Sequence, residues 1–212
     1  MALLHKATLR PSKLDALATW LPGRPWAGRA DVSTLTQVGS YRFDDPAGAV
    51  GIETLLVRTG DGRLLQVPLT YRAAPLAGAG DALVATMEHS VLGPRWAYDG
   101  CADPVGVRTL AAAILTGGHE AELEYHTGDG VERREPTVRV VGSGTPPAAV
   151  PEPTALTVEE GPAGTVVSTG PLVVTVRRWL DGPEPPTEGA ETLRGTWAGT
   201  GAPVLLATAR PA

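Results

Sequence analysis

The sequence predicts an α+β fold, in which a mostly antiparallel sheet is flanked by two helices and followed by a small β-rich C-terminal part. Short apolar segments of strand length are separated by turns rich in glycine and proline, of which the chain contains 26 and 20. Two segments, 12–21 and 103–116, instead carry apolar residues at helical spacing.

The first predicted helix covers residues 12–21, with the sequence SKLDALATWL. Ser12 and Asp15 have the spacing of a capping box, which satisfies free N–H groups at the start of a helix. Pro22 then ends the helix. The apolar stripe of this helix consists of Leu14, Leu17, Ala18 and Leu21.

The second predicted helix covers residues 103–116, with the sequence DPVGVRTLAAAILT. Asp103 is the expected N-cap, Pro104 suits the first helical position, and Gly117 follows the end. The apolar stripe of this helix consists of Val107, Leu110, Ala111 and Ile114.

The remaining apolar segments are predicted to be strands. The clearest hairpin covers residues 50–72, because Asp61 and Gly62 supply the chemistry of a tight turn. A second hairpin is expected over residues 119–141, with its turn at Asp129-Gly130. Further strands are expected in residues 32–43, 82–93, 94–100, 155–160, 165–169, 172–180, 191–197 and 203–210.

Residues 142–153, GSGTPPAAVPEP, have the composition of a linker. They divide the chain into a first part, residues 1–141, and a C-terminal part, residues 154–212. The C-terminal part is too short for a large core of its own. We therefore expect it to dock on the first part or to pair with another chain.

Composition excludes several classes of function. The net charge is −5 and no cluster of Lys and Arg stands out, which argues against nucleic acid as a partner. The apolar runs are far shorter than the roughly 20 residues of a membrane span, and the first 14 residues lack the apolar core of a signal peptide, so we expect a cytoplasmic protein. The single cysteine, Cys101, excludes an internal disulfide and a multi-cysteine metal site, and no histidine stands near it in sequence. We expect no cofactor and no metal.

Three stretches of the chain resemble the N-terminal cap domain of actinobacterial maltokinases and related aminosugar kinases. They are MALLHKATLRPSKLDALATWLPGRPW, VGIETLLVRTGDGRLLQVPLTYR and EHSVLGPRWAYDG. The resemblance covers residues 1–141. It implies a cystatin-like arrangement, in which a curved antiparallel sheet packs against a helix.

In those kinases the cap leads into a kinase N-lobe, where one strand carries a lysine that contacts nucleotide phosphates. Residues 172–186, LVVTVRRWLDGPEPP, resemble that strand, with Thr175 in the place of the lysine. A threonine offers only a neutral hydroxyl, and Pro162 removes one backbone donor from the preceding turn. The residues up to Ala212 contain no second lobe of the family. We therefore expect residues 154–212 to be a β-rich remnant of a kinase N-lobe, and the protein to be no enzyme.

The densest group of polar and aromatic residues lies in residues 88–101, EHSVLGPRWAYDGC. One interpretation is a site for a sugar or another small molecule. The alternative is a hairpin whose Trp96 and Tyr98 fill the face of a sheet while its charged residues pair with neighbours. Arg72 on the preceding strand is either a contact residue or pairs with Glu53 across the hairpin. The candidate ligand or partner surface consists of Arg72, Glu88, His89, Trp96, Tyr98 and Asp99.

These observations favour a non-catalytic interaction or regulatory module related to the caps of maltokinases and aminosugar kinases, linked to α-glucan, trehalose or aminosugar metabolism. Its expected partner is a sugar kinase or a glucan enzyme. The alternative is a carbohydrate-binding or carbohydrate-active protein of the glucan-branching type, although no pair of carboxylates in a cleft is visible. Nucleotide binding is a third hypothesis, against which Thr175 and Pro162 argue. A cap has a face that a catalytic lobe covers, so we expect a monomer covered by its own C-terminal part, or a homodimer.

Overall fold

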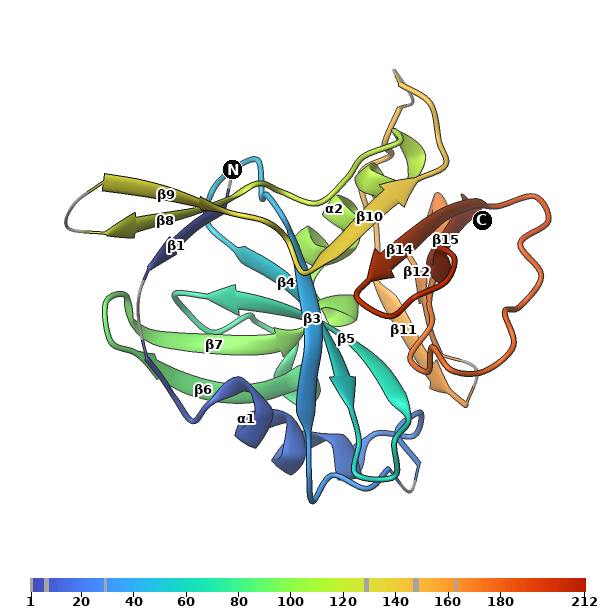
Figure 1. Ribbon diagram of the computed structural model, residues 1–212. Helices are drawn as coiled ribbons and strands as arrows, with labels where there is room; N and C mark the ends of the chain where they lie inside the picture. The colour runs from blue at the N-terminus through green and yellow to red at the C-terminus, as the bar shows by residue number, and fades with distance from the viewer. Residues whose placement is uncertain (1, 6–7, 29, 128–129, 147–148, 163) are drawn as a thin grey trace.

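The computed structural model describes residues 2–5, 8–28, 30–127, 130–146, 149–162 and 164–212, and Figure 1 shows their arrangement. The described residues form two α-helices and three β-sheets, of which two have six strands each. The predicted α+β class, with two helices and a β-rich C-terminal part, is confirmed. No helix among these residues is long and apolar enough to cross a membrane.

The first six-stranded sheet, which we call the cap sheet, is curved and antiparallel throughout, in the order β2-β6-β7-β5-β4-β3. The predicted hairpin over residues 50–72 is present, and Gly62 in its turn has a φ of 84°, a conformation that suits glycine. The segment predicted as a strand from residue 32 becomes one only at Thr36. The strands are β2 (Leu9–Arg10), β3 (Thr36–Phe43), β4 (Gly51–Arg58), β5 (Leu64–Arg72), β6 (Leu83–His89) and β7 (Gly93–Asp99).

Helix α1 (Lys13–Trp20) covers one face of the cap sheet. Ser12 caps it as predicted, because its hydroxyl accepts a hydrogen bond from the N–H of Asp15 at 3.2 Å. The short 3₁₀ helix η1 (Leu21–Gly23) continues from α1. The buried cluster on this face contains Ala16, Leu17, Trp20, Leu21, Trp26, Ala27, Leu55, Val57, Leu65, Val67, Leu69, Val84, Met87 and Ala97.

Helix α2 (Pro104–Leu115) lies on the other face of the cap sheet, after the 3₁₀ helix η3 (Gly100–Ala102). Asp103 is its N-cap, as predicted, and accepts from the N–H of Val105 at 3.0 Å. A third 3₁₀ helix, η2 (Gly80–Ala82), precedes β6.

The second six-stranded sheet, the C-terminal sheet, has the order β10-β14-β15-β13-β12-β11 and is also antiparallel throughout. It packs with α2 against the cap sheet, and one buried cluster includes Leu56 of β4, Ile114 of α2 and Val174 of β13. The two parts of the chain therefore share a core. The strands are β10 (Val138–Gly142), β11 (Thr157–Gly161), β12 (Gly164–Ser168), β13 (Leu172–Val176), β14 (Glu191–Trp197) and β15 (Val204–Pro211).

The C-terminal sheet begins before the predicted linker, because β10 ends at Gly142. The next two residues are also tied into the fold. The N–H of Ser143 donates to the carbonyl of Thr192, and the N–H of Gly144 donates to the carbonyl of Ile114. The predicted boundary between residues 141 and 142 thus lies inside a strand.

A third sheet of three strands projects to one side of the molecule (Figure 1). It consists of β1 (Ala2–His5), β8 (Leu123–Thr127) and β9 (Gly130–Arg134), and β1 pairs in parallel with β8. The predicted hairpin over residues 119–141 is therefore shorter than expected, since β10 leaves it for the C-terminal sheet. Asp129 of its predicted turn lies outside the described residues.

Candidate functional site

The six residues of the predicted ligand surface are divided between the two faces of the cap sheet. Arg72 pairs with Trp96, and Trp96 pairs with Thr86. Because side chains alternate along a strand, Arg72, Glu88, Trp96 and Tyr98 share the face that α2 covers. His89 and Asp99 belong to the opposite face, on which α1 lies. The sequence stretch therefore does not form one site.

Arg72 has a structural partner that the sequence did not reveal. Its Nε lies 2.6 Å from Oδ2 of Asp103, and its Nη2 lies 2.7 Å from Oδ1. Burial alone would raise the pKa of Asp103, but these hydrogen bonds hold that pKa below its usual value. The expected pairing of Arg72 with Glu53 is wrong, because Glu53 lies opposite Leu69 and so points to the other face of the sheet.

Glu53 is almost completely buried and belongs to a charged cluster at the start of α1. Its carboxylate lies 2.5 Å from Nζ of Lys13 and 3.2 Å from Nη2 of Arg42, and it accepts from the hydroxyl of Tyr71 at 3.1 Å. Burial favours the neutral carboxyl, yet the two cations prevail and lower the pKa of Glu53 to about 2. This cluster fastens α1 to the sheet.

The remaining residues of the predicted surface are mostly engaged in local contacts. The hydroxyl of Tyr98, which is buried, accepts from the N–H of Leu76 at 2.9 Å. Nδ1 of His89 accepts from the N–H groups of Val91 and Leu92 at 3.2 and 3.1 Å, which shapes the tip of the β6–β7 hairpin. Glu88 is exposed and Trp96 is half-buried.

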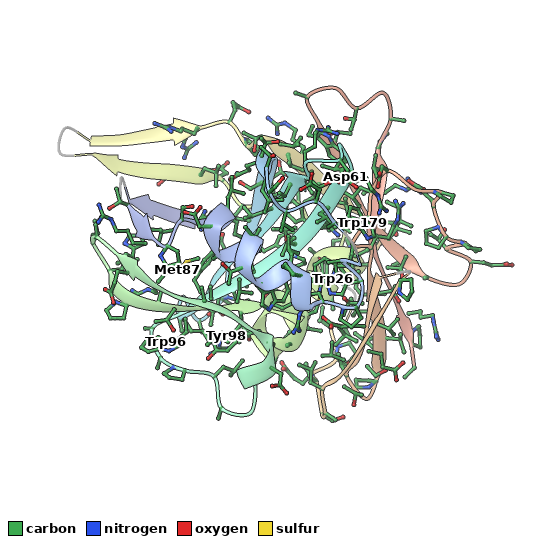
Figure 2. All side chains as sticks on the ribbon, turned by 90° about the horizontal axis from the view of Figure 1, so that it is seen from below. Trp26, Asp61, Met87, Trp96, Tyr98 and Trp179 are labelled. Carbon is green, nitrogen blue, oxygen red and sulfur yellow. The ribbon has the colours of Figure 1, made fainter. Side chains whose placement is uncertain are left out.

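Asp99 belongs to a different place, the junction between the cap sheet and the C-terminal sheet. We use the term junction for Trp26, Asp99, Glu160, Thr165, Arg178 and Trp179. Oδ2 of Asp99 lies 2.5 Å from Nη2 of Arg178, and Nε of Arg178 donates to Oγ1 of Thr165 at 2.8 Å. Arg178 is fully buried, so this ion pair is shielded from solvent. Figure 2 shows Trp26 and Trp179 near this border, away from Trp96 and Tyr98.

Trp26 contacts three residues of the C-terminal part with three different groups. Its ring lies under the guanidinium of Arg178, 4.3 Å from ring centroid to Cζ. Its indole N–H donates to Oε1 of Glu160 at 2.9 Å, and its carbonyl accepts from the indole N–H of Trp179 at 2.8 Å. Trp26 is only 2% exposed, so these contacts are made in a nearly dry environment.

The backbone strengthens the junction. The N–H of Gln66 on β5 donates to the carbonyl of Arg178 at 2.7 Å, and the N–H of Leu180 donates to the carbonyl of Leu64 at 2.9 Å. The amide nitrogen of the Gln66 side chain also donates to the carbonyls of Arg177 and Leu206. The chain that follows β13 is thus paired with β5, which links the two sheets directly.

Thr175, which the resemblance assigned to the place of the kinase lysine, lies on β13 between Val166 and Thr208 of the neighbouring strands. It alternates with the core residues Val174 and Val176, so it points away from the cap. Both neighbouring arginines are bound to other groups. Arg178 binds Asp99, and the guanidinium of Arg177 donates to the carbonyls of Leu205, Gly182 and Pro183. Residues 177–190, all of them described, form no helix between β13 and β14.

Cys101 does not have the surroundings of a nucleophile. It is 2% exposed, and burial strongly raises the pKa of its thiol, which keeps the thiol protonated. It lines a cavity of about 20 Å³ between the cap sheet, α2 and the C-terminal sheet, large enough for one water molecule. Within the described ranges, no three His, Cys, Asp or Glu side chains are grouped so that they could bind a metal ion.

Sequence reasoning missed Trp26, Glu160 and Arg178. Two short clusters of arginine and tryptophan, residues 24–26 and 177–179, were the available signal. Such residues are suited to mutual stacking, but they are about 150 residues apart and nothing in the sequence pairs them.

The described geometry is that of a curved cap sheet joined to a second antiparallel sheet. The family of the maltokinase N-terminal cap domain matches residues 20–103, so the resemblance to this family is confirmed for that segment. The match includes the strands β3 to β7 and both Trp26 and Asp99. Among curated proteins, none matches the sequence.

Among solved structures, a glucosamine kinase in complex with glucosamine, ADP and inorganic phosphate is similar to this chain, with 17% sequence identity and a TM-score of 0.46. The similarity covers 95% of this chain and 41% of the kinase chain. The chain thus spans about two fifths of the length of that kinase.

Proposed function

We propose that this chain is a non-catalytic interaction or regulatory module related to the caps of maltokinases and aminosugar kinases, and that it acts in α-glucan, trehalose or aminosugar metabolism. The family match over residues 20–103 supports the relation to these caps. The proposed partner is a sugar kinase or a glucan enzyme.

One observation carries the non-catalytic part of the proposal. The strand that corresponds to the lysine-bearing strand of kinases has Thr175 at that position, and the two arginines that follow it are held by other groups. Kinase catalysis needs a lysine on this strand, paired with a glutamate from the helix that follows it. Here the segment between β13 and β14 is not helical, which supports the proposal that this pair is missing.

The experiment has two arms. The purified chain is incubated with ATP, magnesium and maltose or glucosamine, and we expect all of the sugar to remain unphosphorylated. A sugar phosphate that depends on the protein would overturn the proposal.

In the second arm, the intact chain is used to capture proteins from its native host, and each captured sugar kinase or glucan enzyme is purified and tested for direct binding. Failure of every such enzyme to bind would remove the proposed partner class.

A carbohydrate-binding function is the second candidate. It is favoured by the half-buried Trp96, which lies on the same face as the exposed Glu88 and opposite Arg72. An aromatic ring beside polar groups suits a sugar ring. Calorimetric titration with maltose, trehalose and glucosamine tests this idea, with Trp96→Ala as the variant. Binding that survives this substitution unchanged would exclude this surface.

A further inference from the structure

The β11–β12 hairpin lies at the edge of the C-terminal sheet, where β12 is the only strand among the described residues that pairs with β11. A short edge strand with one neighbour has few backbone hydrogen bonds and is expected to open more readily than the centre of a sheet. In this molecule, however, the hairpin also contacts the cap. We propose that Trp26 and Glu160 form a latch by which the cap holds the β11–β12 hairpin in one position.

On the cap side of the latch, Trp26 is held by several contacts. The ring of Trp26 is stacked against Arg178, and its carbonyl accepts from Trp179, so the direction of its indole N–H is determined by contacts other than the latch itself. That N–H donates to the carboxylate of Glu160 at 2.9 Å, and Nη1 of Arg24 lies 3.7 Å from the other oxygen. A hydrogen bond to a charged acceptor is stronger than one between neutral groups.

The hairpin is attached at a second point directly across from the first. Glu160 of β11 pairs with Thr165 of β12, and Oγ1 of Thr165 accepts from Nε of Arg178 at 2.8 Å. Arg178 is in turn bound to Asp99 of the cap sheet. Both strands of the hairpin are therefore connected to the cap beside their turn. β12 is also paired with β13, so β11 is the strand that depends most on the latch.

The consequence for partner binding rests on the proposed function. In kinases, the turn between the corresponding strands is glycine-rich and covers the nucleotide phosphates. Here the contacts of Glu160 and Thr165 connect the two strands beside the corresponding turn to the cap. The latch makes the cap and the hairpin respond to a partner as one unit.

Hydrogen exchange of the full chain, measured by mass spectrometry, tests the latch. Glu160→Ala removes the acceptor, and Trp26→Phe removes the N–H donor but keeps a ring. We expect either change to raise the exchange rates of amides in β11, residues 157–161, about ten-fold or more, and those of β4 and β5 not at all. The matched control is Glu159→Ala, since Glu159 is exposed and points to the opposite side of β11. It should leave the hairpin rates unchanged.

Three outcomes would overturn the latch. The hairpin rates could stay unchanged in Glu160→Ala, they could rise equally in every strand, or Glu159→Ala could have the same effect. Because Trp26→Phe alters a buried site, Glu160→Ala alone decides the question if the tryptophan variant does not fold. In the double variant with both Trp26→Phe and Glu160→Ala, the hairpin amides should exchange no faster than in the faster single variant, because both changes remove the same hydrogen bond. A sugar phosphate produced by the chain would disprove the proposed function but would leave these rates as they are.

Discussion

Asp99 at the end of β7 and Arg178 just after β13 form a buried ion pair, although they are 79 residues apart in the sequence. Their side chains are 4% and 0% exposed, and 2.5 Å separates Oδ2 from Nη2. The pair joins the segment that matches the maltokinase cap family to the C-terminal sheet. The two parts of the chain on either side of the predicted linker are thus connected by an ion pair, to which each part contributes one residue.

Breaking this ion pair should destabilise the whole chain. We expect Arg178→Met to lower the free energy of unfolding by about 3–5 kcal/mol, because Asp99 would remain buried without its counter-charge. Denaturant unfolding measures this change. The reactivity of the buried Cys101 thiol toward a thiol reagent should rise in parallel, since this cysteine lies between the two sheets.

The double variant Asp99→Asn/Arg178→Met should lose less stability than the two single variants together, because no lone charge is left. Arg108→Met is the control, since its partner Glu152 is exposed and such pairs contribute about 1 kcal/mol or less. A loss in Arg178→Met no larger than in this control would contradict the importance of the junction.

Glu53 should make stability depend on pH in the acidic range. Its pKa in the folded protein is about 2, below the ordinary value of 4.5, so the folded state favours the ionised carboxylate. This contribution is fully present above pH 4.5 and is lost as the pH falls through 2. It amounts to about 3 kcal/mol.

Glu53→Gln should remove most of this pH dependence between pH 4.5 and 2, together with part of the stability at neutral pH. The measurement is the free energy of unfolding across this range for both proteins. Glu188→Gln, an exposed position, serves as control and should behave like the natural sequence. Curves of equal slope for all three proteins would show that Glu53 is not the group responsible.

Gly144, which follows β10, lies so close to the end of α2 that only glycine fits at this position. A Cβ at Gly144 would lie 2.0 Å from the carbonyl oxygen of Leu115, which is backbone and cannot move aside alone. We expect Gly144→Ala to lower stability by about 1–3 kcal/mol, with a lower Tm in thermal unfolding. Gly201→Ala is the control, because among the described residues only its chain neighbours come within 4 Å of the added methyl group. Equal Tm values for the two variants would disprove the contact.

The linker should be the first site of limited proteolysis. Gly142 to Gly144 are hydrogen-bonded into the fold, so cleavage is expected in the later part of residues 142–153. A protease that cuts after small residues, such as elastase, should cleave after Ala149, with the fragments identified by mass. Earlier cleavage in the turn at residues 59–63 would count against the linker as the weakest segment.

Local sequence chemistry determined most of the secondary structure. The hydroxyl and carboxylate of Ser12 and Asp103 predicted the starts of both helices, and Asp61-Gly62 predicted the turn between β4 and β5. These features depend on residues a few positions apart, which is why the sequence alone reveals them. The sheet to which β10 belongs could not be predicted in this way. Whether a strand joins one sheet or another depends on partners far along the chain.

The sequence by itself thus determined the α+β class, the strands β3 to β7 of the cap sheet and the resemblance to the cap family. Only the tertiary structure decided which charges pair. Arg72 pairs with Asp103 and not with Glu53, because the register of the neighbouring strands places Arg72 and Glu53 on opposite faces of the sheet. The tertiary structure also brought Trp26 to Glu160 and Asp99 to Arg178. Burial makes those contacts strong, and burial arises only when the two sheets close over one core.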